Sequence, residues 1–336
     1  MLFDSSRPLD AVLVGRAAMD FNTVDFTKSF GDNPTFAKFM GGSPANTAVG
    51  MAKLGMKVGF IGRVSDDSMG DFVTDYLKEC GVDTSHIKRC ENGELMGLAF
   101  TATYPDGSTN LMMYRNDDVA DMKLDPDDID EAYIASAKLM VMSGTALSAS
   151  PSREAAIKCL MLAKKVGTKI MFDIDYRPQS WKSRAELSVY YTIAGSFADI
   201  IIGSREEFDL MDSIIAEGDS DEQTAKRWFK QGAEILVIKH GKKGSFAYEK
   251  DGKSYKILPF LVNSIKSTGG GDAYASAFLS ALINGQPLDK CLERGTASAS
   301  LAVAATNCSE ALPDDARLTA FIDDRHAKGE QAVFEI

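Results

Sequence analysis

The sequence places three glycines and an aspartate directly before an alanine-rich helical run, at Gly269-Gly270-Gly271-Asp272. Glycines let the backbone approach a ligand closely and turn its amide groups toward it. Because these amides would lie at the N-terminus of a helix, they favour a bound phosphate group. The alternative is an ordinary turn in which Asp272 caps the helix, although a cap does not require three glycines. We therefore predict a phosphate site here.

A second glycine pair lies much earlier in the chain, in the segment Gly41-Gly42-Ser43-Pro44-Ala45-Asn46. This segment again brings backbone amides and a polar side chain to the start of a helix. An ordinary helix entry would explain it equally well. The sequence contains neither GxxxxGK[ST] nor a GxGxxG after its first strand, so it lacks the fingerprints of P-loop and dinucleotide-binding folds.

The composition is that of a globular enzyme, with 336 residues, 45% of them hydrophobic and 25% charged. The net charge of −11 argues against a nucleic-acid partner, and anionic ligands would require cations gathered locally. Five scattered cysteines without a CxxC pair indicate free thiols. We see no signal peptide and no apolar run long enough to span a membrane, and we expect a cytoplasmic protein.

Short apolar runs alternate with amphipathic stretches, which predicts an α/β fold with a mostly parallel central sheet between helices. The expected strands cover residues 11–15, 58–61, 139–142, 170–173, 200–202 and 235–239. The expected helices cover residues 45–54, 69–80, 152–166, 272–283 and 288–304. We predict one domain over residues 1–336, with a small antiparallel β lid inserted from about 16–40 and 95–116. Its hairpin, 97–103 and 108–114, turns at Pro105-Asp106-Gly107.

The two glycine segments, in this order, resemble the ribokinase-like (PfkB) carbohydrate kinase family over essentially the whole chain. The resemblance implies ATP and Mg²⁺ as cofactors and Asp272 as the general base, with the three glycines as the anion hole. It implies substrate contacts from Asp20, Gly42 and Asn46. It implies a metal-organising role for Glu207, three residues after Ser204, where the family has Asn. The implied nucleotide-binding residues are Ser204, Lys239, Gly241, Gly244 and Asn307.

Lys266 departs from the family pattern, because many members have aspartate there to help hold an activating K⁺ ion. An ammonium group at this position would supply the charge of the missing cation, or it would point to solvent. We expect that K⁺ is not required.

Two arginines bear on the substrate, Arg115 at the end of the lid hairpin and Arg177 after the strand at 170–173. Arginine suits bidentate recognition of carboxylates, although each would more commonly be an ordinary ion-pairing residue. The run Asp175-Tyr176-Arg177-Pro178 is similar to that of 2-keto-3-deoxygluconate kinases. Longer stretches resemble the branch of the family that phosphorylates the 6-hydroxyl of 5-dehydro-2-deoxy-D-gluconate in myo-inositol catabolism. The alternatives are 2-keto-3-deoxygluconate, fructose or another sugar, or a non-enzymatic sugar-acid sensor.

The lid carries several apolar side chains, among them Leu98, Phe100, Leu111 and Met113. We expect them to form one exposed face. Such a face makes a homodimer through the lid plausible.

Overall fold

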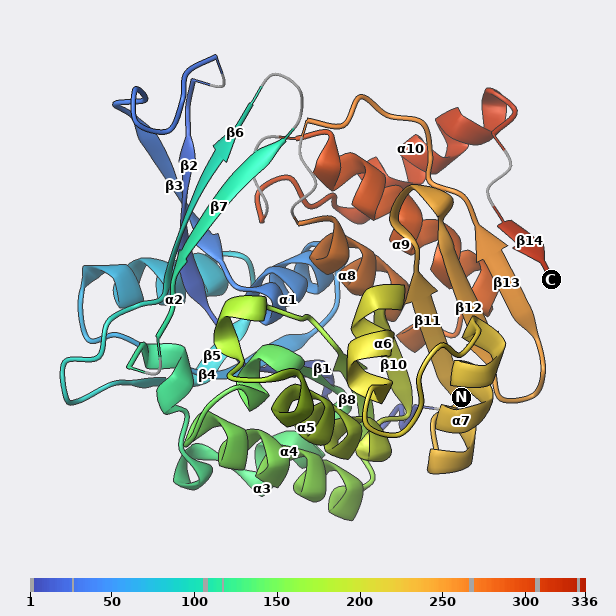
Figure 1. Ribbon diagram of the computed structural model, residues 1–336, viewed down its shortest axis with the longest axis horizontal. Coiled ribbons are helices and arrows are strands. Elements are labelled where there is room, and N and C mark those ends of the chain that lie inside the picture. The colour runs from blue at the N-terminus through green and yellow to red at the C-terminus, as the bar shows by residue number, and fades with distance from the viewer. Residues whose placement is uncertain are drawn as a thin grey trace.

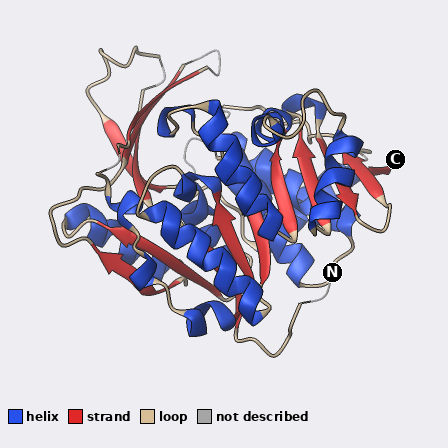
Figure 2. Ribbon diagram, turned by 60° about the horizontal axis from the view of Figure 1, so that its bottom comes forward, coloured by secondary structure: helices blue, strands red, loops and turns tan. Residues whose placement is uncertain are grey.

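The computed structural model describes residues 3–25, 27–104, 108–116, 118–265, 269–305, 309–330 and 333–336. In these ranges a ten-stranded sheet runs through the centre of the molecule, with the order β14-β13-β12-β11-β10-β9-β8-β1-β4-β5 (Figures 1 and 2). Its strands are β1 (Leu9–Val14), β4 (Val58–Val64), β5 (Asp83–Arg89), β8 (Ala137–Ser143), β9 (Lys169–Asp173), β10 (Ile200–Ser204), β11 (Ile235–Lys239), β12 (Ser245–Glu249), β13 (Ser254–Ile257) and β14 (Val333–Glu335).

Neighbouring strands pair in parallel from β5 through to β11, and antiparallel from β11 to β14. The parallel strands are apolar on both faces because helices cover both sides. The predicted α/β fold with a mostly parallel sheet is therefore confirmed. The antiparallel edge was not predicted, since its short strands alternate with exposed polar residues and carry a weak apolar signal.

Helices form a layer on each face of this sheet (Figure 2). Their bounds are α1 (Ser43–Lys53), α2 (Ser68–Glu79), α3 (Glu131–Ala135), α4 (Ser152–Val166), α5 (Arg184–Phe197), α6 (Arg205–Asp212), α7 (Asp221–Gln231), α8 (Gly270–Ile283), α9 (Leu288–Val303) and α10 (Asp315–Ala327). One apolar core joins α1, α2, α8, α9 and α10 to strand residues such as Leu13. The other joins α3 to α7 to the alternate strand residues, such as Val12 and Val14.

A second, four-stranded sheet projects from one side of the molecule (Figure 1). We call it the lid sheet; its strands are β2 (Ala18–Thr23), β3 (Phe36–Gly41), β6 (Leu98–Thr103) and β7 (Thr109–Tyr114), in the order β3-β2-β6-β7. The two outer pairs are antiparallel, and β2 and β6 run parallel to each other. The residues of the predicted hairpin turn, 105–107, lie outside the described ranges. Closure of this sheet as a lid stays a prediction.

The strand register divides the apolar side chains of the lid sheet between its two faces. Ala99 pairs with Met113 and Thr101 with Leu111, and these four side chains face the main cleft. Phe100 lies on the opposite, outer face, because successive side chains of a strand alternate. The expectation that Leu111 and Met113 share a face with Phe100 is therefore wrong. That expectation assigned residues of β6 and β7 to one face without the register between the two strands.

The described residues include no helix that is both long and apolar enough to cross a membrane.

Candidate active site

Many of the residues that the sequence marks as functional lie in one cleft of about 400 Å³, between the lid sheet and the carboxyl ends of the central strands. From β1 the chain goes to β4 and β5 on one side and later to β8 and β9 on the other. Ligands of open α/β sheets bind at such a switch point, outside the carboxyl ends of the strands. The cleft is lined by Arg16, Asp20, Asn22, Gly42, Ser43, Asn46, Ala99, Thr101, Leu111, Met113, Asp173, Asp175, Arg177, Pro178, Gln179, Glu207, Lys239, Gly269, Gly271 and Asp272.

Asp272 lies in the first turn of α8, just behind the glycine run. Gly269 precedes this helix with φ +80°, a left-handed conformation that glycine adopts without strain. The carboxylate accepts hydrogen bonds from Ser43 Oγ at 2.7 Å and from Asn46 Nδ2 at 2.8 Å. Burial, and next the negative charge of Asp175, raise the pKa of Asp272. An oriented carboxylate with a raised pKa beside a helix N-terminus is suited to accept a proton near a phosphate.

Asn46 has a second polar atom in the cleft. Its Oδ1 is buried and has no hydrogen-bond partner among the described residues. A substrate hydroxyl would satisfy this acceptor, while Nδ2 remains bonded to Asp272.

Several carboxylates gather beside Asp272 at the ends of β9 and β10. Asp173 is buried, and burial together with Asp175, Glu207 and Asp272 raises its pKa to about 8, against the opposing effect of Lys239. Glu207 accepts hydrogen bonds from the backbone amides of Tyr176, at 2.8 Å, and Ser204, at 2.6 Å. This excess of negative charge favours the binding of a cation in the cleft.

Lys239 supplies a positive charge next to the glycine run. A Cβ atom built on Gly271 would lie 3.8 Å from Lys239 Nζ, so the ammonium group and the first amides of α8 face the same space. An ammonium group and helix amides together form a site for a phosphoryl group.

A family model described as pfkB family carbohydrate kinase matches residues 9–315 of the chain. The chain belongs to this family. A relative from Clostridium perfringens, named 5-dehydro-2-deoxygluconokinase, is 53% identical over 320 residues, which cover 95% of this chain and 94% of the relative. A relative of the same name from Geobacillus kaustophilus is 47% identical over 330 residues, 98% of each chain.

Solved structures agree with this assignment. A PfkB protein from Polaromonas sp. JS666 is 27% identical, with a TM-score of 0.81 and coverage of 93% of this chain and 99% of the other. A putative ribokinase II from E. coli, solved with ATP and Mg²⁺, is 21% identical and shares the fold, with a TM-score of 0.85 over 94% and 99% of the two chains. The predicted ribokinase-like fold of a pfkB kinase is therefore confirmed.

Most residues predicted for the site of this pfkB kinase reach the cleft. Gly270 lies between two lining residues, at the first position of α8. The predicted residues that line the cleft directly are Asp20, Gly42, Asn46, Arg177, Glu207, Lys239, Gly269, Gly271 and Asp272.

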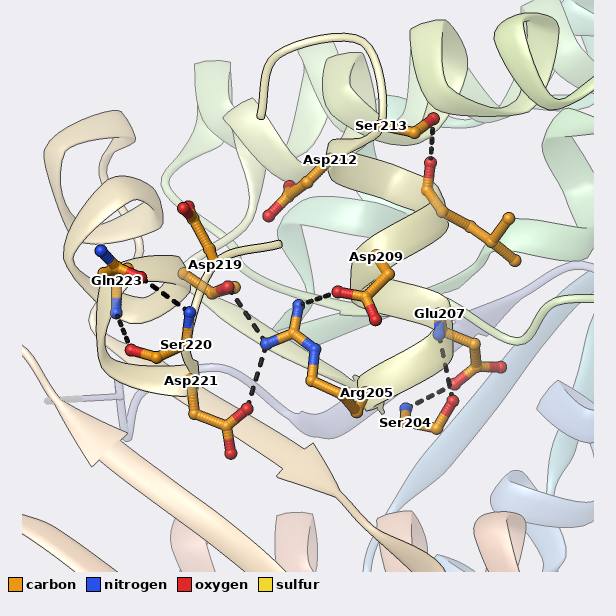
Figure 3. A network of polar contacts seen from close by, with 12 residues as sticks. Ser204, Arg205, Glu207, Asp209, Asp212, Ser213, Asp219, Ser220, Asp221 and Gln223 are labelled. Carbon is orange, nitrogen blue, oxygen red and sulfur yellow. Dashed lines mark hydrogen bonds and ion pairs between the residues drawn. The ribbon is translucent and has the colours of Figure 1, made fainter. Parts of the chain in front are cut away.

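Three residues predicted to bind the nucleotide, Ser204, Gly241 and Gly244, do not line the cleft. Ser204 is the N-cap of α6, and its Oγ accepts a hydrogen bond from Glu207 N at 3.2 Å, so it serves the helix rather than lining the cleft (Figure 3). Gly241 begins a short 3₁₀ turn after β11 and Gly244 follows it, and neither lines the cleft. Asn307 lies outside the described residues, as does Lys266.

A polar network ties this turn to the start of α6. Arg205 pairs with Asp209 at 2.9 Å and with Asp221 at 3.0 Å (Figure 3). The other oxygen of Asp221 contacts His240 Nε2 at 2.7 Å. The residue after Ser204 and the loop after β11 are thus joined through a single carboxylate.

Arg115 does not converge with Arg177 on the cleft, contrary to the expectation from sequence. Its side chain is 3% exposed and pairs with the equally buried Asp121 at 2.6 Å. It also donates to Ser180 Oγ at 2.9 Å and to the carbonyl oxygen of Thr145 at 3.0 Å. These partners satisfy the guanidinium group, so Arg115 connects the end of β7 to the main domain.

The cleft residues that sequence reasoning missed include Arg16, Ser43 and Asp173. Asp173 carried a usable signal, since it alternates with Asp175 and Arg177 at the end of a strand. Ser43 stood inside the glycine segment but resembled a simple helix start. Arg16 carried no signal of its own, because a single arginine after a strand is common.

Proposed function

We propose that this kinase transfers the terminal phosphoryl group of ATP to the 6-hydroxyl of 5-dehydro-2-deoxy-D-gluconate. Support for the substrate comes from relatives named 5-dehydro-2-deoxygluconokinase, 47–53% identical over nearly the full length. The observation that carries the chemistry is Asp272, half-buried at the N-terminus of α8 and held by Ser43 and Asn46.

In this mechanism Asp272 accepts the proton of the substrate hydroxyl as the hydroxyl oxygen attacks the terminal phosphorus of ATP. The bond from this phosphorus to the bridging oxygen breaks, and ADP leaves. The hydrogen bonds from Ser43 and Asn46 fix the carboxylate in one orientation. The first amides of α8, after Gly269, and the ammonium group of Lys239 stabilise the charge that develops on the transferring phosphoryl group. The protein contributes chiefly position and charge neutralisation, which is what phosphoryl transfer requires.

The residues of the cleft fit a magnesium ion that arrives with the nucleotide. The described residues contain no group of three or more ligands that would bind a metal alone. Mg²⁺ is commonly held by one or two carboxylates together with substrate phosphates and water. Asp173 and Glu207 would hold it here, and it would neutralise the phosphate oxygens when bound.

A coupled assay of ADP release tests this function. We expect 5-dehydro-2-deoxygluconate to give the highest kcat/KM, followed by 2-keto-3-deoxygluconate and then fructose. A preference for fructose over both acids would contradict the proposed substrate class. Binding of a sugar acid without any ADP release would instead indicate a sensor.

We also propose that catalysis does not require K⁺. Lys266 stands where many family members have aspartate, and Lys239 already places an ammonium group near Gly271. Turnover in a choline background would then equal turnover in KCl at the same ionic strength. Strong stimulation by KCl would contradict this proposal.

For the assembly, we propose a cytoplasmic homodimer formed through the outer face of the lid sheet. Phe100 stacks on Phe21 with ring centroids 5.1 Å apart and contacts Tyr114 edge-on at 5.7 Å. Tyr114 is 62% exposed in the monomer, so a partner would cover it.

A further inference from the structure

Arg16 is a buried cation in the active-site cleft. It lies in the loop between β1 and β2, lines the cleft, and is only 8% exposed. Within the described residues, its Nε has no hydrogen-bond partner and its guanidinium group forms no ion pair. Burying a charge without a partner is unfavourable, so such a group in a cleft requires an explanation.

The two carboxylates that act on Arg16 most strongly already pair with other arginines. The charges that act on Arg16 are those of Arg115, Asp121, Arg177 and Asp175. Asp121 pairs with Arg115 at 2.6 Å, and Asp175 pairs with Arg177 at 2.7 Å. Both of these carboxylates therefore already have an arginine partner, and neither forms an ion pair with Arg16.

The pKa of Arg16 is that of a buried cation without an ion pair. Burial, and next the positive charge of Arg115, lower the pKa of its guanidinium group. In contrast, Asp175 raises the pKa of Arg177, as expected for a cation that already has a partner. A single negative charge brought next to Arg16 would complete the set of pairs.

The backbone of Arg16 packs closely against the backbone of Gly42. Gly42 adopts φ +97°, and a Cβ built there would lie 2.5 Å from the carbonyl oxygen of Arg16. The close approach of the two backbones is therefore possible only with glycine at this position. The loop that carries Arg16 is fixed against the same segment that positions Ser43 and Asn46 for Asp272.

We propose that Arg16 binds the carboxylate of the sugar-acid substrate and makes the enzyme select acids over neutral sugars. This inference rests on the proposed function. A guanidinium group can donate two parallel hydrogen bonds to one carboxylate. A neutral sugar would leave Arg16 buried and unpaired, and a site with an unpaired polar group discriminates strongly against such a ligand.

The experiment compares 5-dehydro-2-deoxygluconate with its C1 methyl ester, which lacks the negative charge and adds one methyl group. For Arg16→Gln we expect kcat/KM with the acid to fall by about 10²–10³-fold, the range for truncating one partner of a buried charge pair. With the ester it should change by less than about threefold, because no charge pair is lost. Arg16→Lys keeps the positive charge but not the two parallel donors of the guanidinium group. Its kcat/KM with the acid should lie between those of the wild type and Arg16→Gln.

Arg115→Gln is the matched control, because it removes a buried arginine that does have a partner. It should lower the melting temperature by leaving Asp121 unpaired, whereas Arg16→Gln should leave that of the ligand-free protein unchanged or raise it. The acid should raise the melting temperature of the wild type more than that of Arg16→Gln.

The outcomes separate the two proposals. If the wild type prefers the ester to the acid, the proposed substrate class is wrong, whatever Arg16 does. If the wild type prefers the acid and Arg16→Gln keeps the same preference, the assignment of Arg16 is overturned alone. It is also overturned if Arg16→Gln lowers kcat/KM equally for the acid and the ester and has a melting temperature as low as that of Arg115→Gln. That result would show a structural role for Arg16.

Discussion

Ser43 donates a hydrogen bond of 2.7 Å to Asp272, although 229 residues separate the two in the chain. Ser43 begins α1 and Asp272 lies in the first turn of α8, and the two helices pack against each other. The two glycine segments of the sequence are thus parts of one structure, in which the first orients the carboxylate of the second.

Asp272→Asn should remove the proton acceptor without removing volume. We expect turnover to fall by about 10²–10⁴-fold, the usual contribution of a general base. Nucleotide affinity, measured by calorimetry, should remain close to that of the wild type. Wild-type turnover in the variant would show that Asp272 is not the base.

Ser43→Ala should change the pH dependence of the reaction. Hydrogen bonds to the carboxylate lower the pKa of Asp272, so the loss of one raises it further. Since the base must be ionised, the acidic limb of the kcat/KM profile should move to higher pH, by about one unit for one hydrogen bond to a charged group. Ser188→Ala, which removes another buried hydroxyl from α5, should leave the limb in place. An identical shift in both variants would count against the role of Ser43.

Asp173→Asn should alter the dependence of stability on pH. The folded protein keeps this carboxyl protonated up to about pH 8, whereas the unfolded chain releases the proton near pH 4. The contribution of Asp173 to stability is therefore lost as pH rises through this window. Between pH 5.5 and 8.5 the melting temperature of the ligand-free wild type should fall more than that of the variant.

The control for this measurement is Asp324→Asn. Asp324 is exposed on α10, and its hydrogen bond with Lys328 lowers its pKa. It stays ionised across the same window, so the variant should follow the wild type. If the melting temperature of Asp173→Asn falls with pH as steeply as that of the wild type, Asp173 does not hold a proton in the folded state.

Tyr114→Lys tests the lid as a dimer surface. Two lysines brought together across the interface would repel, and the exposed position spares the fold of the monomer. Sedimentation should then show a monomer for this variant and a dimer for the wild type. Leu261→Lys, at a side chain 76% exposed elsewhere, should remain dimeric. The same mass for all three proteins would exclude this face as the interface.

The strands and helices of the main domain that were predicted from sequence lie within a few residues of their observed bounds, whereas β5, α5, α6 and α7 were not predicted. The helix Ser152–Val166 and the strand Ile235–Lys239 match their expected bounds, because their apolar periodicity is strong and their ends carry clear signals. The phosphate end of the cleft was predictable for a related reason. A helix cap does not require three consecutive glycines, so the glycine run at the start of α8 indicates a phosphate site.

The substrate end was less predictable. Arg115 and Arg16 are both single arginines near strand ends, and nothing local distinguishes them. Their roles depend on whether a carboxylate from a distant segment reaches them, as Asp121 reaches Arg115. The faces of the lid likewise depend on the pairing of β6 with β7, which sequence alternation within one strand does not determine.

The alternation of side chains along the lid strands has a consequence for how this enzyme can change over generations. Asn22 faces the cleft, while the neighbouring Phe21 stacks on Phe100 on the outer side. Substitutions at one set of positions would alter which small molecule is accepted, and those at the other set would alter the surface that we propose for self-association. Because the two sets share a backbone but no surface, mutation and selection can act on each without disturbing the other.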